Sequence, residues 1–87
     1  LLVGPIPSTG MISIEHDFST SKTISLSVYN MIGQSLHQES FHAEKMGVHQ
    51  LNLSHLEDGV YFMKFSIHSV VSPEEAPITK TVKLLFK

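Results

Sequence analysis

Alternation of apolar and polar residues with a period of two is the feature that most constrains the fold of this chain. It runs through residues 11–18, 22–30 and 78–87. This period belongs to strands that bury one face, since successive side chains of a strand point to opposite faces. Helical stripes are almost absent. We therefore predict an all-β chain.

Three further segments complete the strand pattern. Residues 34–42 are mostly polar, and we expect them at a sheet edge, where charge discourages aggregation. Residues 48–53 form a short strand. Residues 60–68 are the most apolar segment and have apolar side chains on both faces, which predicts a central strand.

The connecting segments contain turn-forming and polar residues. We predict hairpin connections at residues 19–21 and 43–47, and a tight turn in which Gly33 supplies a positive φ. The capping-box spacing in residues 54–57 predicts one helical turn. Residues 69–77 contain two prolines and two glutamates, which predicts an exposed loop.

Six or seven short strands at spacings of roughly 8–12 residues are typical of an antiparallel sandwich or barrel. Tyr61 favours the sandwich, because the pattern Leu56-x-x-Gly59-x-Tyr61 places it just inside a strand after a corner. There its hydroxyl can bond to upstream backbone, as in the tyrosine corner of immunoglobulin-like folds. An ordinary core tyrosine is the alternative. We predict an immunoglobulin-like antiparallel β-sandwich of about seven short strands.

Composition narrows the possible functions. The 87 residues fit one domain, and a formal net charge of −2 disfavours a nucleic-acid-binding face. The absence of cysteine excludes disulfides and thiolate chemistry. No apolar run reaches the roughly 20 residues of a membrane span. The chain starts with neither methionine nor a signal peptide, so we expect it to be a fragment of a longer protein.

Few residues suit catalysis or metal binding. The carboxylate pairs Glu57–Asp58 and Glu74–Glu75 lie in predicted loops, where neighbours diverge, so we expect no enzyme and no cofactor. Of the six histidines, His42 and His49 are the best pair, facing each other across the 43–47 loop. Two imidazoles fall short of the three or four ligands that zinc takes, so we predict no metal site.

Three aromatic residues are candidates for a ligand-stacking surface on the outer face of the sandwich. They are Tyr29, Phe41 and Phe62. Core packing is the alternative role for each of them.

Several of these segments together resemble one known family. The opening Pro5-Ile6-Pro7-Ser8-Thr9-Gly10, followed by a strand, is similar to the Pro-Asn-Pro opening of the type A C-terminal sorting domain of the type IX secretion system. Ile6 replaces the asparagine of that opening, which removes a side-chain acceptor from the first turn. Residues 26–34 resemble the family's strand and following turn, residues 47–53 and 56–62 resemble its second half, and residues 80–87 resemble its basic ending. The motif residues, for which we expect structural roles, are Pro5, Pro7, Gly10, Asn30, Gly33, Gly47, Leu56, Gly59 and Tyr61.

The resemblance implies that residues 1–87 are a single C-terminal sorting domain of a larger protein secreted by a Bacteroidetes-type bacterium. Such a domain directs its cargo through the periplasm and across the outer membrane. It is recognised by the outer-membrane translocon and a shuttle protein, and a sortase usually removes it. The cargo then stays at the cell surface or is released.

The last strand is the expected recognition element, because its lysines form a basic stripe at a free chain end. The candidate residues are Lys80, Val82, Lys83, Leu84 and Lys87. The alternative is that the lysines protect an edge strand from aggregation, and such an edge also leaves a strand-swapped dimer open. The second functional hypothesis is an immunoglobulin-like adhesive or carbohydrate-binding module that is retained in the mature protein.

Overall fold

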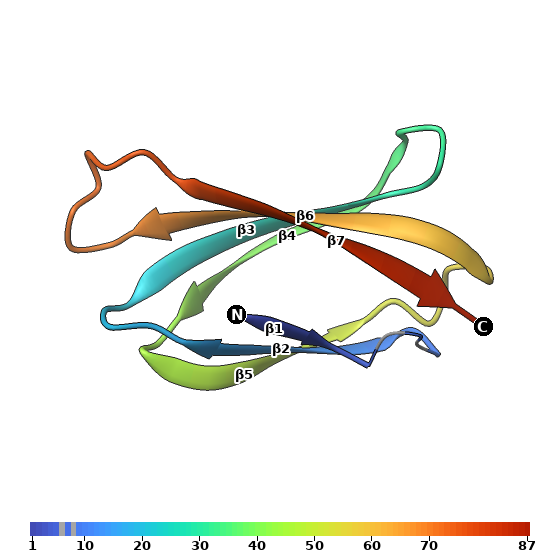
Figure 1. Cartoon of the computed structure of the whole chain (residues 1–87), viewed down its shortest axis with the longest axis horizontal. Helices are drawn as coiled ribbons and strands as arrows, with labels where there is room; N and C mark the ends of the chain where they lie inside the picture. The colour runs from blue at the N-terminus through green and yellow to red at the C-terminus, as the bar shows by residue number, and fades with distance from the viewer. Residues whose placement is uncertain (6, 8) are drawn as a thin grey trace.

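The computed structural model describes residues 1–5, 7 and 9–87, which form seven strands in two antiparallel sheets (Figure 1). The smaller sheet has the order β1-β2-β5 and the larger sheet β4-β3-β6-β7. This confirms the predicted all-β, immunoglobulin-like sandwich. The strands are β1 (Leu2–Gly4), β2 (Met11–Asp17), β3 (Lys22–Tyr29), β4 (Ser35–Ala43), β5 (Met46–Asn52), β6 (Gly59–Ser69) and β7 (Ile78–Phe86). Ile6 lies outside the described residues, and so does the expectation attached to it.

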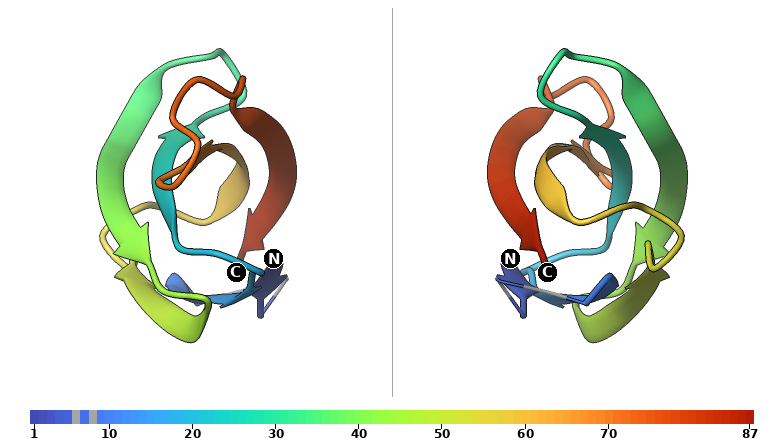
Figure 2. Two further views of the ribbon diagram at one scale, coloured as in Figure 1. Left: turned by 90° about the vertical axis from the view of Figure 1, so that its left-hand side faces the viewer. Right: turned by 90° about the vertical axis from the view of Figure 1, so that its right-hand side faces the viewer.

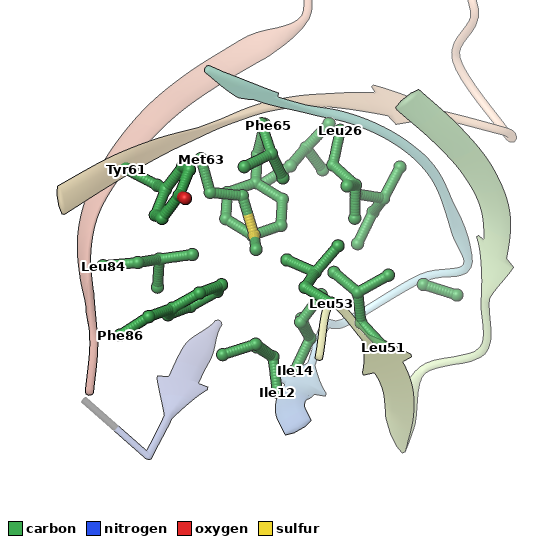
Figure 3. Close-up of a cluster of buried hydrophobic side chains, with 14 residues drawn as sticks. Ile12, Ile14, Leu26, Leu51, Leu53, Tyr61, Met63, Phe65, Leu84 and Phe86 are labelled. Carbon is green, nitrogen blue, oxygen red and sulfur yellow. The ribbon is translucent and has the colours of Figure 1, made fainter. Parts of the chain in front are cut away.

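The core lies between the sheets and is built from the inward-facing residues that the alternation predicted (Figure 3). Phe65 of β6 is fully buried, and Ile12 and Ile14 of β2 point into the core from the smaller sheet on its other side. The buried apolar residues are Ile12, Ile14, Ile24, Leu26, Val28, Ala43, Leu51, Leu53, Tyr61, Met63, Phe65, Ile67, Leu84 and Phe86. Burial of these side chains supplies the main force for folding.

Three connections cross between the sheets: β2–β3, β4–β5 and β5–β6. The first two lie where we predicted hairpins, at residues 19–21 and 43–47, so those two predictions are wrong. β2 pairs with β1 and β5, whereas β3 pairs with β4 and β6. Both β2 and β3 have apolar side chains on one face. Because the two strands lie in different sheets, both strands can bury these side chains in the core between the sheets. The β2–β3 and β4–β5 crossings run close together, because the Phe18 backbone N–H donates to the Lys45 carbonyl at 2.5 Å.

Two other connections are hairpins. The β3–β4 turn contains Gly33, as predicted, with a positive φ of 85°. The exposed 69–77 segment joins β6 to β7, which pair without interruption from Gly59↔Phe86 to Ile67↔Ile78.

The helical turn predicted at residues 54–57 does not form. The Ser54 hydroxyl donates to Asn52 Oδ1 at 2.6 Å instead of capping a helix. Only one turn-type backbone bond is present, from the Leu56 N–H to the Leu53 carbonyl at 3.0 Å. A side chain that bonds to its own local backbone and neighbours competes with helix formation in this way.

The strand order leaves four edges. β4 and β7 bound the larger sheet, and β1 and β5 bound the smaller one. The end views show β4 and β5 along one side of the sandwich and β7 with β1 along the other (Figure 2). The edge position of residues 34–42 and the central position of residues 60–68 are confirmed; the three-residue β1 was not predicted.

Candidate functional site

Most motif residues lie at one end of the sandwich, the right-hand end in Figure 1. Four segments meet there, of which the described residues are 5, 7 and 9–10, 30–34, 53–59 and 85–87. We call this region the motif end. Segments that are far apart in the chain therefore form a single surface.

Asn30 fixes the β3–β4 turn at the motif end. Its Oδ1 accepts from the backbone N–H of Ile32 at 3.1 Å and of Gln34 at 2.9 Å, and its Nδ2 donates to Gln34 Oε1 at 2.9 Å. The Gly33 N–H closes the turn onto the Asn30 carbonyl at 3.1 Å. These contacts involve both Asn30 and Gly33, and the turn exposes Met31 and Ile32.

Tyr61 forms a tyrosine corner at the start of β6. Its hydroxyl donates to the Glu57 carbonyl at 2.6 Å, four residues upstream, and its ring packs on Phe86 with centroids 4.9 Å apart. Gly59 pairs with Phe86 and Leu56 packs against the core. The Tyr61 ring belongs to the core, and its hydroxyl in addition makes the upstream backbone bond of a tyrosine corner, which joins the loop before β6 to the end of β7.

Gly10 allows the start of β2 to lie against the loop before β6. Its φ is 103°, and a Cβ at this position would be only 2.6 Å from Ser54 Cα. Its carbonyl accepts from the Leu53 N–H at 2.7 Å. Pro5 and Pro7 border a hollow of about 240 Å³ together with Thr9 and Lys87, so the last residue lies beside the first loop.

Gly47 is the exception among the motif residues, since β5 carries it toward the opposite end. A Cβ there would be 3.0 Å from Cε1 of His16, the buried histidine that stacks on Phe18. Gly47 therefore makes room for an imidazole in the core.

β7 contains the predicted recognition residues and is an edge strand, as expected. Leu84 is fully buried and Val82 packs against the core, while Lys80 and Lys83 are exposed. Lys80 shares the inward-facing side with Val82, whereas Lys83 faces outward opposite Phe62. The lysines therefore do not form one stripe, because positions three apart in a strand lie on opposite faces.

His42 and His49 do not face each other as the sequence suggested. The His49 Nε2 contacts Glu39 Oε2 at 2.6 Å, and His37 Nε2 contacts the other carboxylate oxygen at 2.8 Å. His42 instead lies 3.4 Å from Glu44. In the part of the chain that the structure describes, no three His, Asp or Glu side chains are arranged to hold a metal ion.

Glu39 is the residue that sequence reasoning missed, and it links β4 to β5 of the opposite sheet. Burial raises the pKa of this carboxyl, but the hydrogen bonds from His37 and His49 outweigh it and leave the pKa below its ordinary value. Phe41, two residues along β4, stacks on His49 with centroids 3.7 Å apart. The sequence does contain a signal for this link, because the inward-facing residues His37, Glu39 and Phe41 together are too polar for an ordinary core face.

The aromatic surface is also different from the expected one. Tyr29 and Phe62 do lie on the outer face, directly opposite each other on β3 and β6. Phe41 faces inward between the sheets, where it contacts His49 and His16.

A comparison with known protein families shows which family this chain belongs to. The family described as "Secretion system C-terminal sorting domain" matches residues 3–75 of the 87-residue chain. The chain belongs to this family. No curated protein matches the chain, and no solved structure does.

The family match covers the motif residues but not the last strand. The matched region includes every motif residue from Pro5 to Tyr61, but it ends before β7. The chain is a C-terminal sorting signal of the type IX secretion system, and such a signal marks a protein for export to the medium or the cell surface. Sorting domains are not an enzyme family. None of the described residues forms a helix that is long and apolar enough to cross a membrane.

Proposed function

We propose that the type IX outer-membrane translocon and its shuttle protein recognise this sorting domain through residues 80–87, which comprise most of β7 and the residue after it. The candidate residues are Lys80, Val82, Lys83, Leu84 and Lys87. The observation that supports this most is the free edge of β7, which pairs with β6 on one side only. A free edge offers unpaired backbone groups to an extended partner segment.

The five candidates divide into two roles. Leu84 is buried and Val82 packs on the core, so these two position the strand. Lys80 and Lys83 are exposed on opposite faces, and Lys87 lies at the motif end beside Pro5 and Pro7. A partner that follows the edge of β7 can contact all three ammonium groups, although no single face displays them.

The wider proposal concerns the route. Residues 1–87 act as a single non-catalytic domain at the C-terminus of a larger secreted protein of a Bacteroidetes-type bacterium. The cargo passes through the periplasm and the outer membrane, and a sortase then removes the domain. A retained adhesive module, the second hypothesis, gains no support from the family match.

Deleting residues 83–87 is a poor test of recognition, because it removes Leu84 and Phe86 from the core. Loss of export would then report unfolding as well as loss of contact. Substitution of exposed lysines avoids this problem, since surface changes usually alter stability by about 0.5 kcal/mol or less.

The experiment fuses a signal peptide and a fluorescent reporter to residues 1–87 in a type IX-competent host and in a translocon-deficient strain. The test variant is K80Q/K83Q/K87Q. The matched control is K22Q/K45Q/K64Q, which removes the other three of the six basic residues.

Retention of the test variant in the periplasm, with normal export of the control, supports recognition at β7. Equal export of both variants overturns it. Export of the wild-type fusion without loss of the domain would contradict the sortase step alone.

A further inference from the structure

The outward face of the β4-β3-β6-β7 sheet forms a regular array of side chains, which we call the hydroxyl face. Strand pairing places most of its residues in four cross-strand rows, and the apolar pair Val60 and Leu85 lies beyond the first row. In strand order the rows are Ser35, Tyr29, Phe62 and Lys83; Gln38, Ser27, Lys64 and Thr81; Ser40, Ser25, Ser66 and Thr79; and His42, Thr23 and His68.

Charge on the hydroxyl face has a single sign. Lys64 and Lys83 are diagonal neighbours, because Lys64 pairs with Thr81. No outward position of these four described strands holds a carboxylate. Of the chain's carboxylates, Glu15 and Asp17 lie on β2, Glu39 points inward, and the rest lie in connections. The nearest to the array is Glu44, beside His42 at its far end.

The polar part of the face is slightly hollowed. A depression of about 270 Å³ lies over β3 and β4 and is lined by Ser25, Ser27, Gln38 and Ser40, with Ser25 and Ser40 hydroxyls 3.1 Å apart. Leu26 and Glu39 also border it. Both of those side chains point into the sandwich, since Leu26 is buried and Glu39 bonds to His49 of the opposite sheet.

The aromatic part adjoins both lysines. Tyr29 and Phe62 are half-buried direct partners, and Phe62 pairs with Lys83 on its other side. Two aromatic residues at directly paired positions of neighbouring strands offer apolar surface of the kind that the flat apolar face of a sugar ring covers. The adjacent ammonium groups suit a carboxylate or another anionic group on that sugar.

We propose that the hydroxyl face binds an anionic polysaccharide. One sugar ring covers Tyr29 and Phe62, its anionic group and that of a neighbouring sugar meet Lys64 and Lys83, and further hydroxyls bond in the serine-lined depression. Charge complementarity requires an anion. The many side-chain hydroxyls, together with a backbone already paired in β3 and β6, favour a polyhydroxylated ligand over an added peptide strand.

This proposal goes beyond sorting and does not depend on it. The hydroxyl face is distinct from the free edge of β7, and it would bind polysaccharide whether or not a translocon recognises that edge. It also does not require that the domain stay attached to its cargo.

The test measures binding of the 87-residue chain to three polymers by isothermal titration calorimetry. The polymers are polygalacturonate, neutral dextran and polyglutamate. The variant K64E/K83E removes the positive charge of the face, and Y29T/F62T removes the aromatic platform while keeping residues that favour strands. The matched control K45E/K80E makes the same charge change at exposed positions away from the face. Thermal melting checks that each variant is folded.

We expect the wild-type chain to bind polygalacturonate and neither of the other polymers. The affinity should fall at least about tenfold in K64E/K83E and about fivefold in Y29T/F62T, and by less than about twofold in K45E/K80E. Equal binding of polyglutamate would overturn the proposal in favour of an acidic protein partner. Absence of polygalacturonate binding, or an equal loss in the control, would also overturn it.

Discussion

The two edges of the larger sheet differ in how they are held. β4 contacts the opposite sheet through His49 of β5, which hydrogen-bonds to Glu39 and stacks on Phe41. β7 is tied by apolar burial of Leu84 and Phe86 near its end, and its first residues, including Ile78 and Lys80, are exposed. The β4 edge is therefore linked to the opposite sheet by side-chain contacts. The β7 edge is held by the core only near its carboxyl end, and its first residues are exposed to solvent.

The largest expected effect is loss of the apolar attachment of β7. Phe86→Ala removes a buried ring that packs on Tyr61, and we expect a decrease of about 3–5 kcal/mol in the free energy of unfolding. Urea denaturation followed by circular dichroism measures this. A loss below about 1 kcal/mol would show that the end of β7 is not fixed by the core.

A smaller loss is expected at β4. Glu39→Ala leaves two half-buried histidines without their acceptor, which should lower the free energy of unfolding by about 1–2 kcal/mol. Glu39→Gln keeps one acceptor oxygen and serves as the control, with a smaller loss. If both variants match the wild type in urea, the polar link between the sheets contributes nothing to stability.

The pH dependence of stability distinguishes the two attachments. Because the folded-state pKa of Glu39 lies below its unfolded value of 4.5, the contribution of this carboxylate is complete above that value and is lost as the pH falls through the folded pKa. Between about pH 6 and about pH 3, the stability advantage of the wild type over Glu39→Gln should therefore shrink. The same comparison with Phe86→Ala should give a difference that is nearly constant with pH.

The smallest effect on stability is expected for the exposed lysines of β7. K80T/K83T should change the free energy of unfolding by about 0.5 kcal/mol or less, yet increase self-association because the edge loses its charges. Light scattering after size exclusion measures this. A strictly monomeric variant would argue against both a protective role for the lysines and a strand-swapped dimer.

The sequence predicted the faces of the strands better than their pairing. Alternation alone placed Ile12 and Ile14 on one face of their strand, and the structure buries that face, because burial follows directly from the period of two. Whether a short polar connection turns within a sheet or crosses to the other depends on which faces must meet across the core. That is a tertiary property, and a hairpin and a crossing look alike at residues 19–21 and 43–47. The three-residue β1 was too short to show any period.

For the candidate site, the spacing around Tyr61 predicted a local bond and the structure contains it, since Glu57 is only four residues away. The link from Glu39 to His49 could not be predicted in this way, because it depends on two sheets facing each other. The supposed stripe of Lys80 and Lys83 was an error that the period of two could have prevented.

The three crossings between the sheets also determine when the fold can form. The central pairs of both sheets join residues that are far apart in the sequence: Ile12 pairs with Leu51 in the smaller sheet, and Val28 pairs with Met63 in the larger one. Loops of this length must close before any native contact compensates for their entropy, so we expect folding on the millisecond-to-second scale typical of sandwiches. Neither half of the chain contains a complete sheet, because β2 pairs with β5 and β3 pairs with β6. The complete sandwich can therefore form only after β7 has joined it and has brought Leu84 and Phe86 into the core.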